Sequence, residues 1–191
     1  MAEKNDYVNR ELSWIEFNYR VLSEARDKST PLFDRLKFLS ITASNLDEFY
    51  MVRVASLKDM VHAKYAKKDI AGLTAKEQLD KISEKTHQLV DLQYSTYNRS
   101  LVPALKQNGL RIVMEHEDLT EDEAAFADEY FHKNVYPVLT PMAFDSSRPF
   151  PLIRNKTLNI AALLKKKNEK EAELEFAMVQ VPSVIPRIVE L

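Results

Sequence analysis

Residues 9–25, NRELSWIEFNYRVLSEA, place apolar side chains at the spacing of an α-helix. The apolar positions recur every three or four residues and form one broad stripe: Leu12, Trp14, Ile15, Phe17, Tyr19, Val21, Leu22 and Ala25. A stripe of this width is typical of a helix that packs against others in a bundle. We therefore predict a first helix over residues 9–25, with Trp14 buried in a helical core.

A second helix is predicted to begin after a short turn. Thr30 offers a capping hydroxyl, and Pro31 suits the first helical position, where its missing N–H costs nothing. Residues 42–45, TASN, predict a break or kink near Asn45, because short polar side chains compete with the helical backbone for hydrogen bonds. Two pairs then have the spacing of a cap and an acid that could restart the helix: Ser44 with Asp47, and Asn45 with Glu48.

A third, long helix is predicted to follow a polar connection. Thr74 and Glu77 have the spacing of a capping box, and an apolar helical pattern continues from there to Leu105. Pro103 could kink or restart the last turns, and Gly109 can adopt the left-handed conformation that ends many helices. Together the three helices predict an antiparallel three-helix bundle over residues 1–109.

The pattern changes after Gly109, where we place a domain boundary. Residues 110–114 are β-branched and strand-like, and Thr120 with Glu123 predicts a helix through about residue 134.

Further along, prolines at 137, 141, 149 and 151 exclude a long helix. Residues 158–164 and 174–181 predict two strands joined across a charged stretch, and the alternation of Leu174, Phe176 and Met178 with polar or small neighbours supports a half-buried hairpin. Residues 110–191 are thus predicted to form a partial mixed α/β domain, and the fold class is α+β.

Composition narrows the functional classes. The 191 residues are 45% hydrophobic and 29% charged, with a net charge of −2, which suits a folded domain and argues against nucleic-acid binding. Cysteine is absent, which excludes disulfides, thiolate nucleophiles and cysteine-ligated metals, and 2 glycines leave no glycine-rich phosphate loop. No apolar run approaches the roughly 20 residues of a membrane span, and residues 1–6 lack a signal peptide's apolar core, so we expect a cytoplasmic protein.

The four histidines, His62, His87, His116 and His132, form no metal-binding or catalytic motif. His116 lies in an acidic stretch, EHED, that we interpret as a solvated turn rather than a divalent-ion site. The lysines of residues 165–170 alternate with glutamates, and we interpret them as a solvated hairpin tip. We predict no catalytic residue and no metal ligand in this chain.

Two features could bind an anion or a nucleotide. Five basic residues would converge near Asn45 if the first two helices are antiparallel, or would be exposed charges on amphipathic helices: Arg10, Arg20, Arg35, Lys37 and Arg53. The amide of Asn45 offers one acceptor and two donors, so it can match the edge of an adenine base. Its alternative role is a helix cap, which the spacing alone favours.

Six blocks of the chain resemble, in order, the amino-terminal part of bacterial polyphosphate kinase of the phosphohistidine type. They are NRELSWIEFN (9–18), PLFDRLKFL (31–39), SNLDEFYMVRVA (44–55), PVLTPMAFD (137–145), RPFPLI (148–153) and NK (155–156). Any one block is weak, but their order over most of the chain is specific. Ser56 and residues 146–148 depart from the pattern in a helix surface and a loop, and put no stated function in doubt.

The resemblance implies an amino-terminal fragment of a four-domain enzyme. Residues 1–109 would be the helical N domain and residues 110–191 part of a head domain that contributes to dimerisation, so a homo-oligomer is expected. Members of the family reversibly transfer the terminal phosphate of ATP to inorganic polyphosphate, through a phosphohistidine in their carboxy-terminal domains. None of the four histidines here matches that motif, so the fragment is predicted to be inactive alone.

One functional residue carries over from the resemblance. Asn45 matches the family's nucleotide-contacting asparagine, which implies contact with ATP or ADP, with capping as a compatible second role. The Mg²⁺ of the parent enzyme has no ligands in this fragment, and the sequence leaves a peripheral membrane association of the parent open. The alternative interpretation of the chain is a non-enzymatic helical assembly module, suggested by the missing catalytic constellation and by its apolar stripes.

Overall fold

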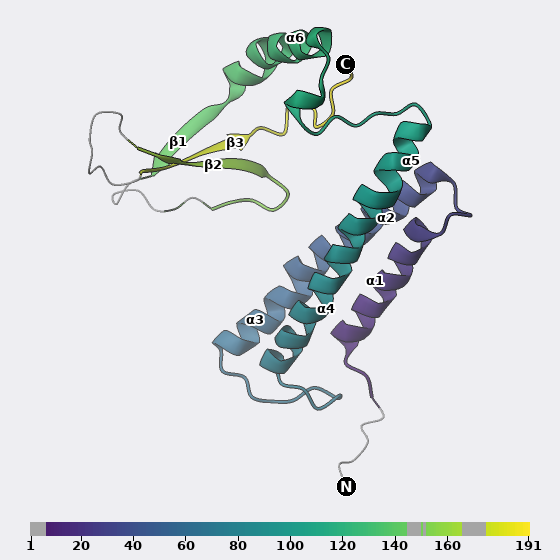
Figure 1. The fold of residues 1–191 in the computed structure, drawn as a ribbon. Coiled ribbons are helices and arrows are strands. Elements are labelled where there is room, and N and C mark those ends of the chain that lie inside the picture. Colours follow the sequence, from purple (N-terminus) through teal and green to yellow (C-terminus); the bar gives the residue numbers. More distant parts are fainter. Residues whose placement is uncertain (1–6, 145–149, 151, 166–174) are drawn as a thin grey trace. The chain divides into compact units, whose positions relative to one another are not determined.

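A computed structural model describes residues 7–144, 150, 152–165 and 175–191 of the chain. The chain divides into two compact units, Met1–Ile112 (unit 1) and Val113–Leu191 (unit 2), drawn in Figure 1. The boundary that we predict after Gly109 lies close to this division. Each unit is described below by itself.

Unit 1 is a bundle of three long helical rods. The first rod is α1 (Arg10–Arg26). The second joins α2 (Leu32–Phe49), a π-helical turn η1 (Tyr50–Val54) and α3 (Ala55–His62) without interruption. The third joins α4 (Ala75–Thr96), a π-helical turn η2 (Tyr97–Leu101) and α5 (Val102–Gln107). α1 packs against both α2 and α4, so the predicted three-helix bundle is confirmed (Figure 1).

The face that α1 buries differs in part from the predicted stripe. Its buried residues are Ile15, Asn18, Leu22 and Ala25. Phe17, which belongs to the predicted stripe, is 46% exposed. Trp14 is half-buried rather than fully buried. The apolar pattern of the sequence could not predict the whole buried face of α1, because the fully buried Asn18 is polar.

The predicted break near Asn45 is wrong. α2 runs through this residue, and the first change of helical geometry comes at Tyr50, where the π-helical turn begins. The short polar side chains do form their own hydrogen bonds, but without opening the helix: Thr42 Oγ1 donates to the carbonyl of Phe38 at 2.9 Å. Asn45 therefore caps no helix.

The start of α2 also differs from the prediction. Pro31 occupies the N-cap position, and no side chain caps this end, so the capping role expected for Thr30 is wrong.

Other helix ends follow the sequence signals closely. Thr74 and Glu77 form the predicted capping box of α4, and Thr120 and Glu123 form the one that starts α6 (Glu121–Tyr130). Hydrogen bonds from the backbone N–H and hydroxyl of Thr74 hold the pKa of the Glu77 carboxyl below its usual value. Gly109 has a φ of 83°, the left-handed conformation expected of a residue that ends a helix.

A buried polar network fixes the start of α1. Asn9 Oδ1 accepts from the backbone N–H of Leu12 at 2.8 Å and thereby caps the helix. Its Nδ2 donates to Asp69 Oδ2 at 2.7 Å and to Gln78 Oε1 at 2.9 Å. Asp69 Oδ1 accepts in turn from the N–H of Leu73 at 2.7 Å. One side chain thus joins α1, the connection before α4, and α4 itself.

The apolar core of unit 1 has two clusters. The first, near the start of α1, contains Ile15, Phe49, Val54, Leu57, Ala75 and Ile82. The second, near its end, contains Leu22, Ala25, Leu39, Leu89 and Leu101. Burial of these side chains is the main favourable contribution to the stability of the bundle.

Unit 2 combines α6 with a small antiparallel sheet. Between α6 and the sheet come a π-helical turn (Phe131–Val135) and a 3₁₀ turn (Tyr136–Val138). The strands are β1 (Thr140–Phe144), β2 (Leu158–Leu164) and β3 (Glu175–Val181), in the order β1-β3-β2. β2 and β3 form the predicted antiparallel pair, with Ile160 opposite Val179, and the α+β class is confirmed.

Two details of unit 2 differ from the predictions. Residues 110–114 form no strand, because no strand in the described part of the chain pairs with them. β1 was not predicted, because it contains Pro141. This proline is tolerated since β1 lies at the edge of the sheet and, among the described residues, pairs with β3 alone.

Candidate functional site

Asn45 lies within α2, on the side of the helix that faces α1. Its side chain is half-buried, and its Nδ2 donates to Oδ1 of Asn18 in α1 at 3.1 Å. Asn18 is fully buried, and its own Nδ2 donates to the backbone carbonyl of Thr42 at 3.1 Å. The site is therefore a relay of two asparagine amides anchored on the backbone of α2.

The relay leaves part of the Asn45 amide unused. An asparagine side chain has two N–H donors and one acceptor oxygen, and Asn45 uses one donor for Asn18. The second N–H and Oδ1 remain for a ligand. A paired donor and acceptor of this kind matches the edge of a nucleobase.

Two aromatic side chains of α1, Trp14 and Phe17, lie close to Asn18 in the sequence. Trp14 stacks on Phe49 of α2, with ring centroids 4.4 Å apart and planes inclined by 3°. Phe17 is three residues further along α1, and its ring is 46% exposed. The guanidinium of Arg20 lies 5.8 Å from the centre of this ring. Phe17 precedes Asn18 in the chain and offers a surface on which a base can stack.

A shallow groove of about 290 Å³ runs between α2 and α4. Its lining residues are Ala43, Leu46, Asp47, Tyr50, Val90, Gln93 and Tyr94. The hydroxyls of Tyr50 and Thr86 lie 2.9 Å apart beside it. Asn45 does not line this groove, because its side chain is directed to Asn18 of α1.

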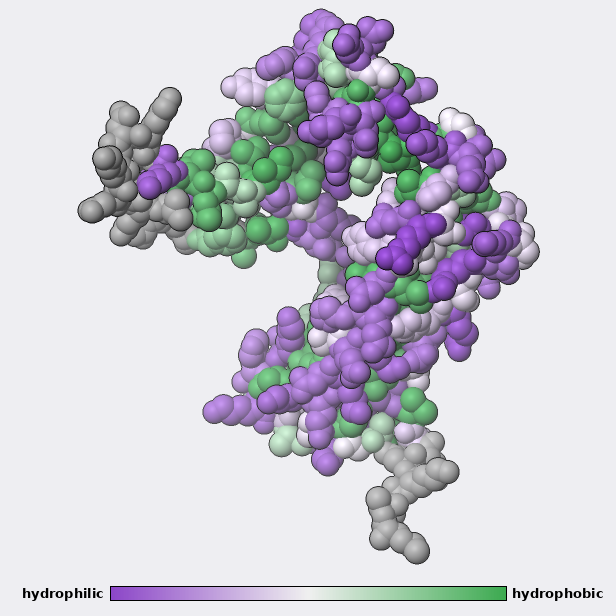
Figure 2. All heavy atoms as spheres, in the orientation of Figure 1, coloured by the Kyte–Doolittle hydropathy of each residue, from purple (hydrophilic) through white to green (hydrophobic). Residues whose placement is uncertain are grey.

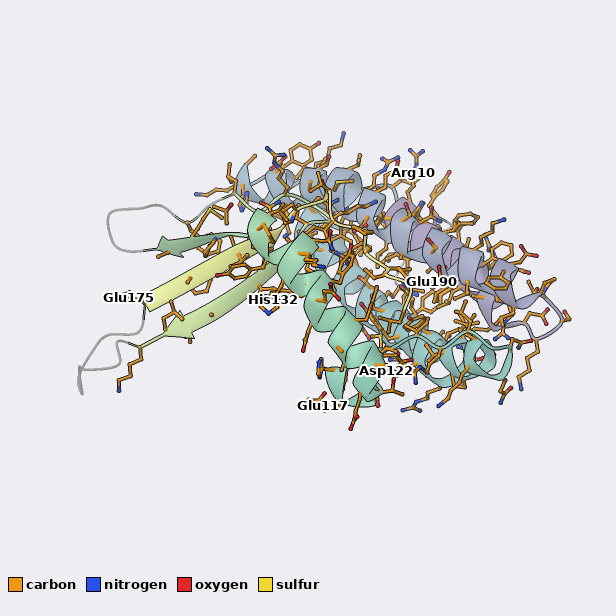
Figure 3. The ribbon with its side chains drawn as sticks, turned by 90° about the horizontal axis from the view of Figure 1, so that it is seen from above. Arg10, Glu117, Asp122, His132, Glu175 and Glu190 are labelled. Atoms are coloured by element: carbon orange, nitrogen blue, oxygen red, sulfur yellow. The ribbon has the colours of Figure 1, made fainter. Side chains whose placement is uncertain are left out.

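The five basic residues do not all converge near Asn45. Arg35 is buried at the other end of the bundle, where Nε donates to the carbonyl of Ala25 at 2.9 Å and Nη2 to Ser100 Oγ at 2.8 Å. Arg10 is exposed at the first residue of α1 (Figure 3). It lies 15 residues before Ala25, or roughly 22 Å along the helix. Arg35 is therefore a structural residue and not part of an anion-binding corner, while Arg10, Arg20, Lys37 and Arg53 are exposed, as the second interpretation expects.

The histidines and acidic residues of the described chain form no metal site. No group of three or more histidine, aspartate or glutamate side chains is placed to hold an ion within the residues described. His116 is exposed, with Nε2 3.7 Å from Asp128 Oδ1. Glu117, Asp122 and His132 are also exposed in unit 2 (Figure 3). Of the lysine-rich segment 165–170, residues 166–170 lie outside the described residues.

None of the helices that the structure describes combines the length and the apolarity needed to cross a bilayer.

Comparison with known proteins identifies the family. The sequence pattern of the polyphosphate kinase N-terminal domain matches residues 7–113, and that of the polyphosphate kinase middle domain matches residues 122–191. The chain belongs to the polyphosphate kinase family. The first match covers unit 1 with the Asn45 relay, and the second covers most of unit 2.

Individual polyphosphate kinases are similar over nearly the whole chain. The enzyme of Lactiplantibacillus plantarum is 55% identical over 185 residues, and polyphosphate kinase 1 of Chlorobaculum tepidum is 44% identical over 192 residues. The crystal structure of polyphosphate kinase from Porphyromonas gingivalis has 34% sequence identity and a TM-score of 0.82, covering 97% of this chain. The chain spans only about a quarter of these relatives, 26% and 27% of the two enzymes and 27% of the crystallised chain.

The family resemblance and the structure contribute different parts of the site. Asn45 was singled out by its amide and by the family pattern, but its hydrogen-bond partner was not. Asn18 gives no sequence signal beyond a polar residue in an apolar stripe, three residues after Ile15 and four before Leu22. That position, on the line of buried residues, is the one cue that could have revealed it.

Proposed function

We propose that this chain is the amino-terminal part of a polyphosphate kinase and supplies a contact to the adenine base of ATP or ADP through Asn45. The whole enzyme would reversibly transfer the terminal phosphate of ATP to inorganic polyphosphate. The observation that carries the proposal is the half-buried Asn45 amide, held by Asn18 with one donor and one acceptor unused.

The role of Asn45 in this proposal is positional. Directional hydrogen bonds to the base orient the nucleotide, and groups elsewhere in the enzyme act on its phosphates, so Asn45 takes no part in the chemical step. The exposed ring of Phe17 supports the proposal, since aromatic stacking commonly complements hydrogen bonds to a base. We assign ligands of Mg²⁺ to no described residue, because none of them forms a suitable cluster. The chain alone is proposed to make no polyphosphate.

Replacing Asn45 with alanine is expected to weaken ATP binding by this chain about two- to tenfold, the equivalent of about one net hydrogen bond. The measurement is an ATP titration followed by the backbone and side-chain amide signals of labelled protein. Asn98→Ala is the matched control, because Asn98 is an exposed asparagine of the same unit on the third rod. Identical titrations for wild type and Asn45→Ala would contradict the proposed contact.

We also propose that unit 2 contributes to a homo-oligomer. β2 carries four apolar side chains that are between 44% and 68% exposed: Leu158, Ile160, Leu163 and Leu164. Figure 2 shows hydrophobic residues gathered over the sheet of this unit. Exposed apolar area of this kind marks surfaces that other protein segments cover.

Light scattering over a range of protein concentrations tests the oligomer. We expect association of the wild-type chain, and weaker association when Leu163, the most exposed of the four, is replaced by serine. A strictly monomeric chain at high concentration would contradict both this proposal and the alternative of a self-sufficient assembly module. Phe33→Ser, at an exposed apolar residue of unit 1, is the control.

A further inference from the structure

We infer that Asn18 is a positioning residue that fixes which way the Asn45 amide points, and that this makes the site prefer adenine to guanine. The inference rests on the proposed nucleotide contact and adds a base specificity and a second residue to it. It follows from the hydrogen-bonding capacity of three groups in sequence, the Thr42 carbonyl, the Asn18 amide and the Asn45 amide.

The first step is the orientation of Asn18. Its side chain is 0% exposed, so water cannot satisfy its polar atoms. The group that it meets on α2 is the backbone carbonyl of Thr42, 3.1 Å away, and a carbonyl oxygen can only accept. The Nδ2 of Asn18 must therefore face Thr42, because the opposite orientation would bury two acceptors against each other.

The second step is the orientation of Asn45. With Nδ2 of Asn18 facing Thr42, Oδ1 of Asn18 faces Asn45, whose Nδ2 donates to it at 3.1 Å. Rotating the Asn45 amide by half a turn would bring its Oδ1 against Oδ1 of Asn18 and would leave a buried oxygen without a donor. Such an unsatisfied group is unfavourable, so the amide of Asn45 is locked.

The third step is the discrimination between the two bases by the locked amide. Adenine presents the N6–H donor where guanine presents the acceptor O6. An asparagine that rotates freely could match either base by exchanging its oxygen and nitrogen. The locked amide keeps Oδ1 at a fixed place, where it accepts from adenine N6–H but would meet O6 of guanine. The selection therefore comes from Asn18, which need not touch the nucleotide.

The test compares ATP with GTP on the 191-residue chain, using titrations followed by the side-chain amide signal of Asn45. We expect wild type to bind ATP about five- to tenfold more tightly than GTP, and Asn18→Leu to reduce this preference to about twofold or less. Leucine has nearly the size of asparagine, but it cannot accept a hydrogen bond from the Asn45 amide. Thr96→Val is the matched control, since it removes a buried hydroxyl bonded only within α4 and should leave the ATP to GTP ratio unchanged.

The possible results separate this inference from the proposed function. No response of the Asn45 signal to either nucleotide would overturn both. Equal affinity of wild type for ATP and GTP would overturn the positioning role alone, and needs no variant to fold. An unchanged preference in a folded Asn18→Leu, checked by its backbone amide spectrum, would overturn it too. Loss of preference in Asn18→Leu but not in Thr96→Val would establish it.

Discussion

Replacing Asn9 with alanine is expected to lower the free energy of unfolding of unit 1 by about 2–4 kcal/mol. Loss of the N-cap of α1 accounts for about 1 kcal/mol. The remainder comes from the oxygen of Gln78, which is 6% exposed and would lose the donor that Asn9 provides. Chemical denaturation followed by circular dichroism measures the change.

Thr74→Ala is the comparison that isolates the network. Thr74 also caps a helix, but its bonds to Glu77 are exposed, so its loss should cost only about 1 kcal/mol. If both variants lose the same stability, then Asn9 acts as a simple cap, and the buried network adds nothing to the bundle.

Leu89→Ala is expected to have an effect of similar size, about 3 kcal/mol within the roughly 2–5 kcal/mol range for leucines in tight cores. Leu89 is 0% exposed and belongs to the cluster that joins α1, α2 and the third rod. Truncation removes apolar burial and leaves a cavity that three helices can only partly close. The same denaturation experiment measures this change in the free energy of unfolding.

Phe33→Ala is the control for the core prediction. It removes more atoms than Leu89→Ala, but Phe33 is 66% exposed and belongs to neither cluster, so we expect a change of less than about 1 kcal/mol. Equal losses from the two variants would show that the cluster around Leu89 is not the core of the folded chain in solution.

The helices were predicted well from the sequence because the residue patterns that define a helix lie within a few positions of one another. The capping boxes at Thr74 and Thr120 depend on residues three positions apart, and both form as expected. The helical apolar repeats likewise predicted the three rods, and the alternation in residues 174–181 supported the β2–β3 pair. These elements were predictable because the interactions that define them are visible within one segment of the chain.

The sequence-based predictions were wrong where contacts with distant segments determine the local structure. The residues around Asn45 predicted a helix break. In the structure the Asn45 amide donates a hydrogen bond to Asn18 of α1, 27 residues away in the sequence, and the helix stays intact. The sequence offers no sign that Arg35 is buried, yet its guanidinium donates hydrogen bonds to the carbonyl of Ala25 and the hydroxyl of Ser100. β1 was missed because the tolerance of Pro141 depends on its place at a sheet edge.

The π-helical turn at Tyr50–Val54 bears on how the second rod can vary in length. Phe49 and Val54 are successive buried residues of one core cluster, yet they lie five positions apart, where α-helical spacing would give three or four. The wider turn accommodates the additional residue while Val54 and Leu57 stay on the core side. An insertion or deletion of one residue would normally rotate everything downstream by about 100°. Here the π-helical turn already holds one surplus residue, so a relative that lacked one residue at this turn would keep the residues of α3 on the same core side.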